Sequence, residues 1–271
     1  MSITINEAVS FETLSIPLSD LRKNVTKGDD GFQPLFSTVS GALQRINQSE
    51  EWNGSAWAEG NNMNSSRSDS HVAGIQTAAV SAFGVISTSR TNKTEEYNGT
   101  SWSEVNNTPV AADGTRGSGT LTAGIFTGGD TPDRIATTFL YDGTNWTAGG
   151  DLNTARYNGG TAGTQTAALA AQGESVNSEE YNGTSWTEGN NMGTARGKNA
   201  AAGNYTNAIV GNGSTPGTPG IGIINNVETW DGSSWSEIAE INSIRDANGM
   251  SANGTSTAVI YFGGNASPGC L

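Results

Sequence analysis

Residues that could hold a soft metal or activate a nucleophile are few in this chain. His71 is its single histidine and Cys270 its single cysteine among 271 residues. Zinc and copper sites use three or four such ligands, and a nucleophile triad needs a histidine as its base. We therefore expect no such metal centre, no cofactor and no catalytic residues. His71, beside Val72, is expected to be structural or on the surface, and Cys270 cannot form an internal disulfide.

Two loops offer polar groups for binding. Asp130, Asp133 and Arg134 follow Gly128-Gly129, while Thr215 and Thr218 lie in a second loop that is rich in Pro and Gly. A calcium site in the first loop would lack the regularly spaced acidic ligands of a calcium-binding loop. These five residues are the candidate binding residues, and the alternative for both loops is a solvated turn.

Composition narrows the class of protein. The chain has 13 Lys and Arg against 26 Asp and Glu, a net charge of −13, so we expect no nucleic-acid partner. No segment approaches the roughly 20 apolar residues of a membrane span, and the first residues do not resemble a secretory signal. We expect a soluble protein with no membrane insertion. The 37 glycines suit many short strands joined by tight turns.

A repeated motif organises most of the chain. Five segments read aromatic, Asn or Asp, Gly, Ser or Thr, any residue, Trp, as in Tyr97-Asn98-Gly99-Thr100-Ser101-Trp102. Asn-Gly or Asp-Gly between two aromatic segments predicts a hairpin with one aromatic on each strand. The Gly, and often the Asn, is expected to adopt a left-handed conformation. The closing tryptophans, spaced by 45, 44, 40 and 49 residues, are Trp57, Trp102, Trp146, Trp186 and Trp235.

Each motif belongs to a longer unit that also carries charge. An Arg follows each motif tryptophan, ten residues on in four repeats and fourteen residues on at Arg116. A Glu precedes the first aromatic by two residues in four motifs, and Phe139 takes that place in the third. Because the displaced Arg116 is followed by the motif that holds Phe139, we predict an Arg–Glu ion pair inside each ordinary repeat.

Four strands in about 40–45 residues match one propeller blade. The first motif has no inner strands before it, and the last repeat has no aromatic hairpin after it. Joining these halves in one blade would remove two open edges. The sequence therefore predicts an all-β, five-bladed β-propeller over 48–271, closed by its N- and C-terminal strand pairs. Its innermost strands are expected at 159–163 and 199–203, where small residues suit a narrow axis.

This order of features resembles kelch repeats over about residues 48–264. Two repeats keep a Gly pair, and the others have Phe83-Gly84, Gln172-Gly173 and Gly211-Asn212. The Asn-Gly-Thr-Ser-Trp style is also similar to repeats of marine tailed-phage virion structural proteins. That resemblance implies a non-enzymatic tail or capsid accessory protein, made in the host cytoplasm and carried in the extracellular particle. Its partners would be other virion proteins and further copies of itself.

Residues 1–47 form an N-terminal arm outside the repeat. After Pro34, one face of a predicted amphipathic helix carries Phe36, Val39, Leu43 and Ile46. This face either covers the chain's own propeller or docks on a partner or a second copy.

A second function fits the same fold. Propellers place recognition on long loops at the ends of their blades, and aromatic side chains can stack on sugars. The alternative is therefore a carbohydrate- or host-receptor-binding propeller whose partner is a host surface glycan.

Overall fold

The computed structural model describes residues 47–171, 173–216 and 222–242, and parts of 244–266. These residues contain the strands β1 to β24 and no helix, so none of them forms a helix that could cross a membrane. The chain forms two compact units, Met1–Gln44 and Arg45–Leu271, and the described residues all belong to the second. The predicted helix with Phe36, Val39, Leu43 and Ile46 lies outside the described residues, as do Thr218 and Cys270.

Four antiparallel sheets of four strands each, here called blades 1 to 4, make up most of the second unit. Blade 1 holds β3 (His71–Ile75), β4 (Ala78–Ala82), β7 (Thr94–Tyr97) and β8 (Trp102–Val105). Blade 2 holds β9 (Arg116–Thr120), β10 (Ala123–Thr127), β11 (Thr138–Tyr141) and β12 (Trp146–Ala148). Blade 3 holds β13 (Gly160–Thr164), β14 (Ala167–Ala171), β15 (Ser178–Tyr181) and β16 (Trp186–Glu188). Blade 4 holds β17 (Ala200–Asn204), β18 (Asn207–Gly211), β19 (Val227–Trp230) and β20 (Trp235–Ile238).

The remaining described strands form two-stranded sheets. These pairs are β1 (Glu50–Trp52) with β2 (Trp57–Glu59), and β5 (Val85–Ile86) with β6 (Ser89–Arg90). In the last repeat, β21 (Arg245–Asp246) pairs with β24 (Asn265–Ala266), and β22 (Gly249–Met250) pairs with β23 (Tyr261–Phe262).

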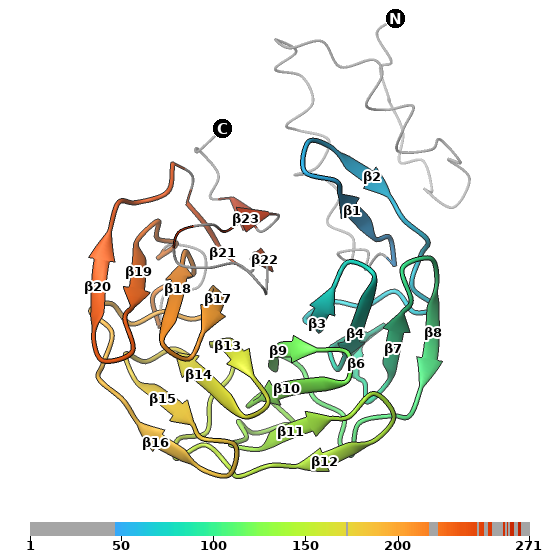
Figure 1. The fold of residues 1–271 in the computed structure, drawn as a ribbon, viewed down its shortest axis with the longest axis horizontal. Helices are drawn as coiled ribbons and strands as arrows, with labels where there is room; N and C mark the ends of the chain where they lie inside the picture. Colours follow the sequence, from blue (N-terminus) through green and yellow to red (C-terminus); the bar gives the residue numbers. More distant parts are fainter. Residues whose placement is uncertain are drawn as a thin grey trace, which may run out of the picture. The chain divides into compact units, whose positions relative to one another are not determined.

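The blades follow one another around a common axis, as in a β-propeller (Figure 1). The first strand of each blade is innermost, so β3, β9, β13 and β17 are successive neighbours, and β22 lies next to β17. The segments predicted to be innermost, 159–163 and 199–203, coincide with β13 and β17 to within one residue. That prediction is confirmed.

The predicted aromatic hairpins are confirmed. In each of the five motifs the two aromatics are direct cross-strand partners, as for Tyr181 and Trp186, whose ring centroids lie 4.8 Å apart. The motif glycine is left-handed, as at Gly183 with φ 91°. The expectation that Asn shares this conformation is wrong. The Oδ1 of Asn182 instead accepts the backbone N–H groups of Thr184 and Ser185, both at 2.9 Å, so the side chain closes the turn.

A left-handed two-residue corner follows the second strand of three blades. It consists of Phe83-Gly84, Gly128-Gly129 and Asn212-Gly213, with φ between 60° and 118°. The fourth repeat therefore matches the Gly pair with Asn212-Gly213, one residue later than the Gly211-Asn212 expected from the sequence. Gly211 stays in β18, paired with Ala200.

Candidate functional site

The predicted Arg–Glu pairs are present in blades 1, 3 and 4. Arg67 lies 2.5 Å from Glu95, Arg196 lies 2.6 Å from Glu228, and Arg156 contacts Glu179. All six side chains are buried. Each pair also has further hydrogen bonds, which a buried charge requires.

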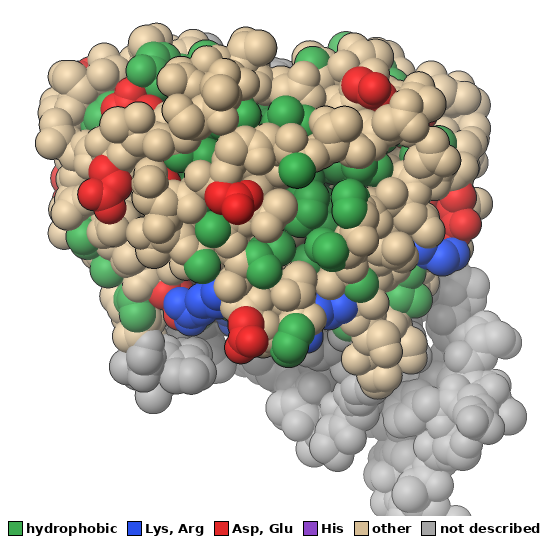
Figure 2. Space-filling model, turned by 90° about the horizontal axis from the view of Figure 1, so that it is seen from below, with side chains coloured by type: hydrophobic (Ala, Val, Ile, Leu, Met, Phe, Trp, Pro, Cys, Tyr) green, Lys and Arg blue, Asp and Glu red, His purple; other side chains and the backbone are tan. Residues whose placement is uncertain are grey.

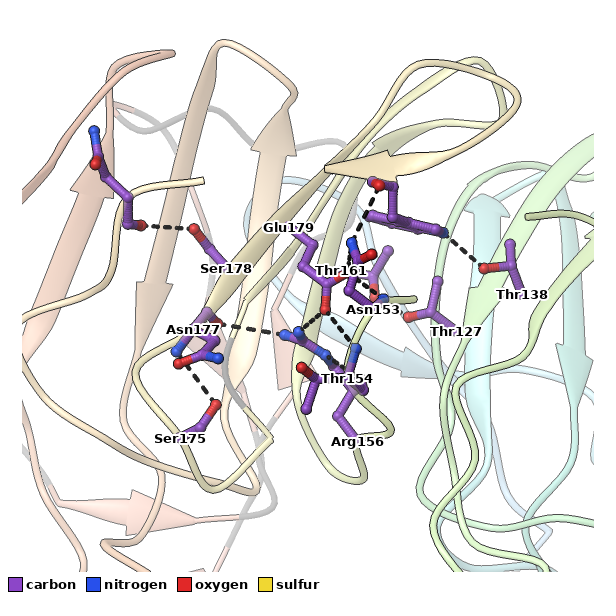
Figure 3. A network of polar contacts seen from close by, with 12 residues as sticks. Thr127, Thr138, Asn153, Thr154, Arg156, Thr161, Ser175, Asn177, Ser178 and Glu179 are labelled. Carbon is purple, nitrogen blue, oxygen red and sulfur yellow. Dashed lines mark hydrogen bonds and ion pairs between the residues drawn. The ribbon is translucent and has the colours of Figure 1, made fainter. Parts of the chain in front are cut away.

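The pair of blade 3 illustrates the arrangement (Figure 3). Glu179 accepts the backbone N–H of Asn153 at 2.6 Å and that of Thr154 at 3.3 Å, while Arg156 donates to the carbonyl of Asn177 at 3.3 Å. The carboxylate therefore binds the loop that enters the blade. The pair positions this loop, and both of its charges are used inside the protein.

Blade 2 replaces the ion pair with apolar side chains. Ala112 occupies the Arg position, ten residues after Trp102, and Phe139 occupies the Glu position. Phe83, at the corner of blade 1, packs on Phe139 with ring centroids 5.0 Å apart. The equivalent corner residue of the next blade is Gly128, where a Cβ would lie 3.2 Å from Cγ of Arg156. The bulk of Phe83 therefore occupies space that a neighbouring Arg occupies elsewhere.

A half-open pocket of about 440 Å³ lies at this substituted position. Its lining is mainly apolar and includes two hydroxyl groups: Val110, Ala111, Thr131, Ile135, Thr137 and Phe139. Apolar side chains also gather in the middle of the face that carries β11 and β12 (Figure 2). The pocket has the chemistry to hold an apolar group flanked by hydroxyls.

The first candidate loop, 130–134, joins three blades by ion pairs. Arg90 of blade 1 contacts Asp113 at 2.6 Å and Asp130 at 3.2 Å. Arg134 reaches Glu174 of blade 3 at 2.5 Å. Most charges of this loop are therefore paired, and the loop lies beside the pocket, because Thr131 belongs to both and Ile135, which follows the loop, also lines the pocket.

The other candidate residues are placed apart from this network. Asp133 is exposed, and its carbonyl accepts the N–H of Thr131 at 3.0 Å inside the loop. Thr215 lies in blade 4, where its N–H donates to the carbonyl of Gly222 at 2.8 Å. The described residues contain no group of three or more His, Cys, Asp or Glu side chains that could hold a metal ion.

A chain of backbone hydrogen bonds joins the blades where the innermost strands begin. Gly114 donates to the carbonyl of Asp69 at 3.4 Å, Asn158 to that of Gly114 at 2.9 Å, and Lys198 to that of Asn158 at 2.8 Å. All four residues are left-handed, with φ between 53° and 63°. This conformation turns the backbone so that each N–H meets the carbonyl of the preceding blade.

Two basic side chains lie beside this chain of bonds. Arg116 donates to Oδ1 of Asn158 at 2.9 Å, and burial lowers its pKa to about 10, so it stays charged at neutral pH. Nδ1 of His71 accepts the N–H of Gly117 at 3.0 Å. Burial, with the nearby charge of Arg116, lowers the pKa of His71 to about 3. His71 is thus a neutral structural acceptor between blades 1 and 2.

The outer strands meet through contacts that sequence reasoning missed. A motif tryptophan donates its indole N–H to a hydroxyl of the preceding unit, as Trp186 does to Thr138 at 2.8 Å. The other three described pairs of this kind are Trp102–Ser49, Trp146–Thr94 and Trp235–Ser178, at 3.2–3.4 Å. The signal was a Ser or Thr eight residues before four of the five tryptophans. The role of this Ser or Thr was not evident from the sequence, because it binds the tryptophan of the next unit and not its own.

Two further contacts recur between these strands. The phenol of Tyr141 donates to Glu96 at 2.5 Å, and that of Tyr97 donates to Glu51. An Asn four residues after the tryptophan donates to a turn carbonyl of the next unit, in the pairs Asn61–Thr100, Asn106–Thr144 and Asn190–Ser233, at 2.6–2.9 Å. Together with the indole contact, they fix the position of one blade on the next.

No protein-family model matches this chain, and no curated protein matches it.

Proposed function

We propose that the chain is a non-enzymatic structural protein of a tailed-phage particle, in which a closed, five-bladed, kelch-like propeller acts as an interaction platform. The observation that carries this proposal is that the repeated polar residues make structural contacts within and between the blades. Arg and Glu form buried pairs within blades, while indole, phenol and amide groups join one blade to the next. The repeat thus builds a rigid support.

The rest of the proposed role follows the resemblance of the repeats. The N-terminal arm, residues 1–47, attaches the propeller to other virion proteins or to further copies of the chain. The particle location would be the tail or a capsid accessory position, and the protein would be extracellular once the particle is released.

Mass spectrometry of purified particles tests this role. We expect the chain at a fixed, stoichiometric copy number. A truncated chain that lacks residues 1–47 should fold and fail to join particles. Absence of the chain from particles, or normal incorporation of the truncated chain, would contradict the proposal.

The pocket of blade 2 favours a second candidate, a carbohydrate- or host-receptor-binding propeller. Its apolar walls and the hydroxyls of Thr131 and Thr137 fit the faces and edges of a sugar ring. On a glycan array, selective binding that Val110→Arg abolishes would support this function. Ile75→Arg is the matched control, because Ile75 is 54% exposed and outside the pocket lining. Equal binding by both variants would reject the pocket as the sugar site.

A further inference from the structure

The outer edge of blade 4 differs from the corresponding edges of the units before it. Eight residues before the motif tryptophan, the earlier units have an indole acceptor, whereas blade 4 has Val227. The acceptors of the earlier units are Ser49, Thr94, Thr138 and Ser178. At the position of the phenol acceptors Glu51 and Glu96, blade 4 has Thr229. At the position of the donors Asn61, Asn106 and Asn190, it has Ala239.

All three substitutions remove the group that would join blade 4 to a following outer hairpin. Valine has no hydroxyl, threonine has no carboxylate and alanine has no amide. Blade 2 also lacks two of the groups, with Leu140 and Gly150, but it keeps the hydroxyl of Thr138. Among the described blades, blade 4 alone lacks all three.

The edge left on blade 4 is mixed in character, with Ser236, Glu237 and Glu240 exposed beside Ile238. Ile238, at the end of β20, is 42% exposed. Val227 is buried in a cluster with Ile209, against which Val259 of the last repeat packs. The last repeat therefore already meets blade 4 through apolar contact.

The β1–β2 hairpin has a matching character. Toward blade 1 it uses Ser49, Glu51 and Asn61 in the ordinary polar contacts. Its own two motif aromatics are Trp52, which has no phenol to donate, and Trp57, which is 44% exposed. Trp52 therefore brings no phenol to this junction, just as Trp230 brings none to the junction with blade 3.

We infer that the outer edge of blade 4 receives the chain's own β1–β2 hairpin without any of the three polar contacts that recur between the other units. This inference rests on the closed ring of the proposed function. Because Val227, Thr229 and Ala239 cannot make these three contacts, this junction is the place at which the ring opens first.

Cross-linking tests the occupant of this surface. In a full-length Cys270→Ser background, Ser55→Cys with Ala239→Cys places thiols at the positions equivalent to Thr144 and Asn106. After mild oxidation we expect an internally cross-linked monomer on a non-reducing gel. Asn106→Cys with Thr144→Cys is the matched positive control, because those residues are already in contact.

The cross-linked products distinguish the chain's own β1–β2 hairpin from the hairpin of a second copy. A cross-linked dimer would assign the surface to a second copy and overturn the inference. If the control pair cross-links and Ser55→Cys with Ala239→Cys does not, the closed ring and the inference both fail.

Restoring one polar contact tests the character of the junction. Ala239→Asn supplies the missing donor, so we expect the full-length chain to melt about 2 °C higher, whereas Ala239→Asp, which cannot donate, gives no rise. The reverse change, Asn106→Ala, should lower Tm by a similar amount. If Ser55→Cys with Ala239→Cys cross-links within one chain but Ala239→Asn does not raise Tm, the ring closes and the inference about its junction is wrong.

Discussion

Single side chains hold neighbouring blades in place, and His71 does so only while it is neutral. Its Nδ1 accepts the N–H of Gly117, and burial beside Arg116 lowers its pKa to about 3. Above pH 6.5 the histidine is neutral in both the folded and the unfolded chain. Between pH 6.5 and 3 the unfolded chain binds a proton that the folded chain does not, so the free energy of unfolding falls as the pH falls.

We therefore expect His71→Gln to lose less stability than the wild type between pH 6.5 and 4, because glutamine can accept the same bond without titrating. Urea unfolding at several pH values measures this. Parallel pH profiles for the two proteins would show that His71 does not titrate as its burial requires.

The buried ion pair of blade 3 makes a second prediction at this scale. Removing one partner leaves a buried charge, so Arg156→Ala and Glu179→Phe should each cost about 3–5 kcal/mol. The double variant copies Ala112 and Phe139 of blade 2 and leaves no unpaired charge. Its cost should therefore be well below the sum of the two single costs in a denaturant double-mutant cycle. Additive costs would mean that the pair does not act as a unit.

At the scale of the strands, glycine in the innermost hairpins is required by close approach. Gly163 in β13 has φ 110°, and a Cβ there would lie 2.4 Å from the carbonyl oxygen of Ala167. Gly54, in the β1–β2 turn, has φ 96° with open space around it. Gly163→Ala should therefore cost more than Gly54→Ala, which measures the backbone strain alone, about 1–3 kcal/mol. Equal losses in thermal unfolding would exclude the steric clash.

The indole contact between outer strands gives another strand-level prediction. Thr138→Val removes the acceptor of the Trp186 indole and reproduces the residue found at Val227. We expect a loss of about 1–3 kcal/mol, because the buried N–H is left unpaired. Thr138→Ser keeps the hydroxyl and should stay near wild type in urea unfolding. If Ser and Val destabilise equally, the loss comes from packing.

The sequence predicted the strands better than the contacts between them. Local patterns were sufficient for the aromatic hairpins, the small innermost strands and the Arg–Glu pairs, because each repeats within one blade. For blade 4, the sequence predicted the left-handed corner one residue too early, at Gly211-Asn212 instead of Asn212-Gly213. Residue types alone do not determine which of two adjacent residues adopts a positive φ. The role of Thr138 was missed because its partner, Trp186, belongs to the next blade.

The pocket of blade 2 likewise depends on contacts between blades that the sequence did not reveal. The sequence marked the third motif as unusual through Phe139 and the displaced Arg116. It did not show that Ala112 stands at the Arg position, or that Phe83 of another blade fills part of the space. Both facts depend on how neighbouring blades pack. Both are needed to locate the pocket beside Thr131 and Ile135.

At the scale of the whole molecule, the compact unit Arg45–Leu271 should fold without the residues before it. Asn47 already belongs to this unit, because its Nδ2 donates to the carbonyl of Met63 at 2.8 Å. We expect deletion of residues 1–44 to leave a cooperative thermal transition and a Tm within a few degrees of the full chain. A broad transition or loss of near-UV circular dichroism would show that the first unit is part of the fold.

The separation along the chain between blades that touch has a consequence for synthesis. The indole donors and their hydroxyl acceptors are 53, 52, 48 and 57 residues apart. Each new blade therefore finds its docking partner among the residues that left the ribosome just before it. Assembly can proceed blade by blade from the N-terminal side during translation, with each finished sheet serving as the template on which the next one settles.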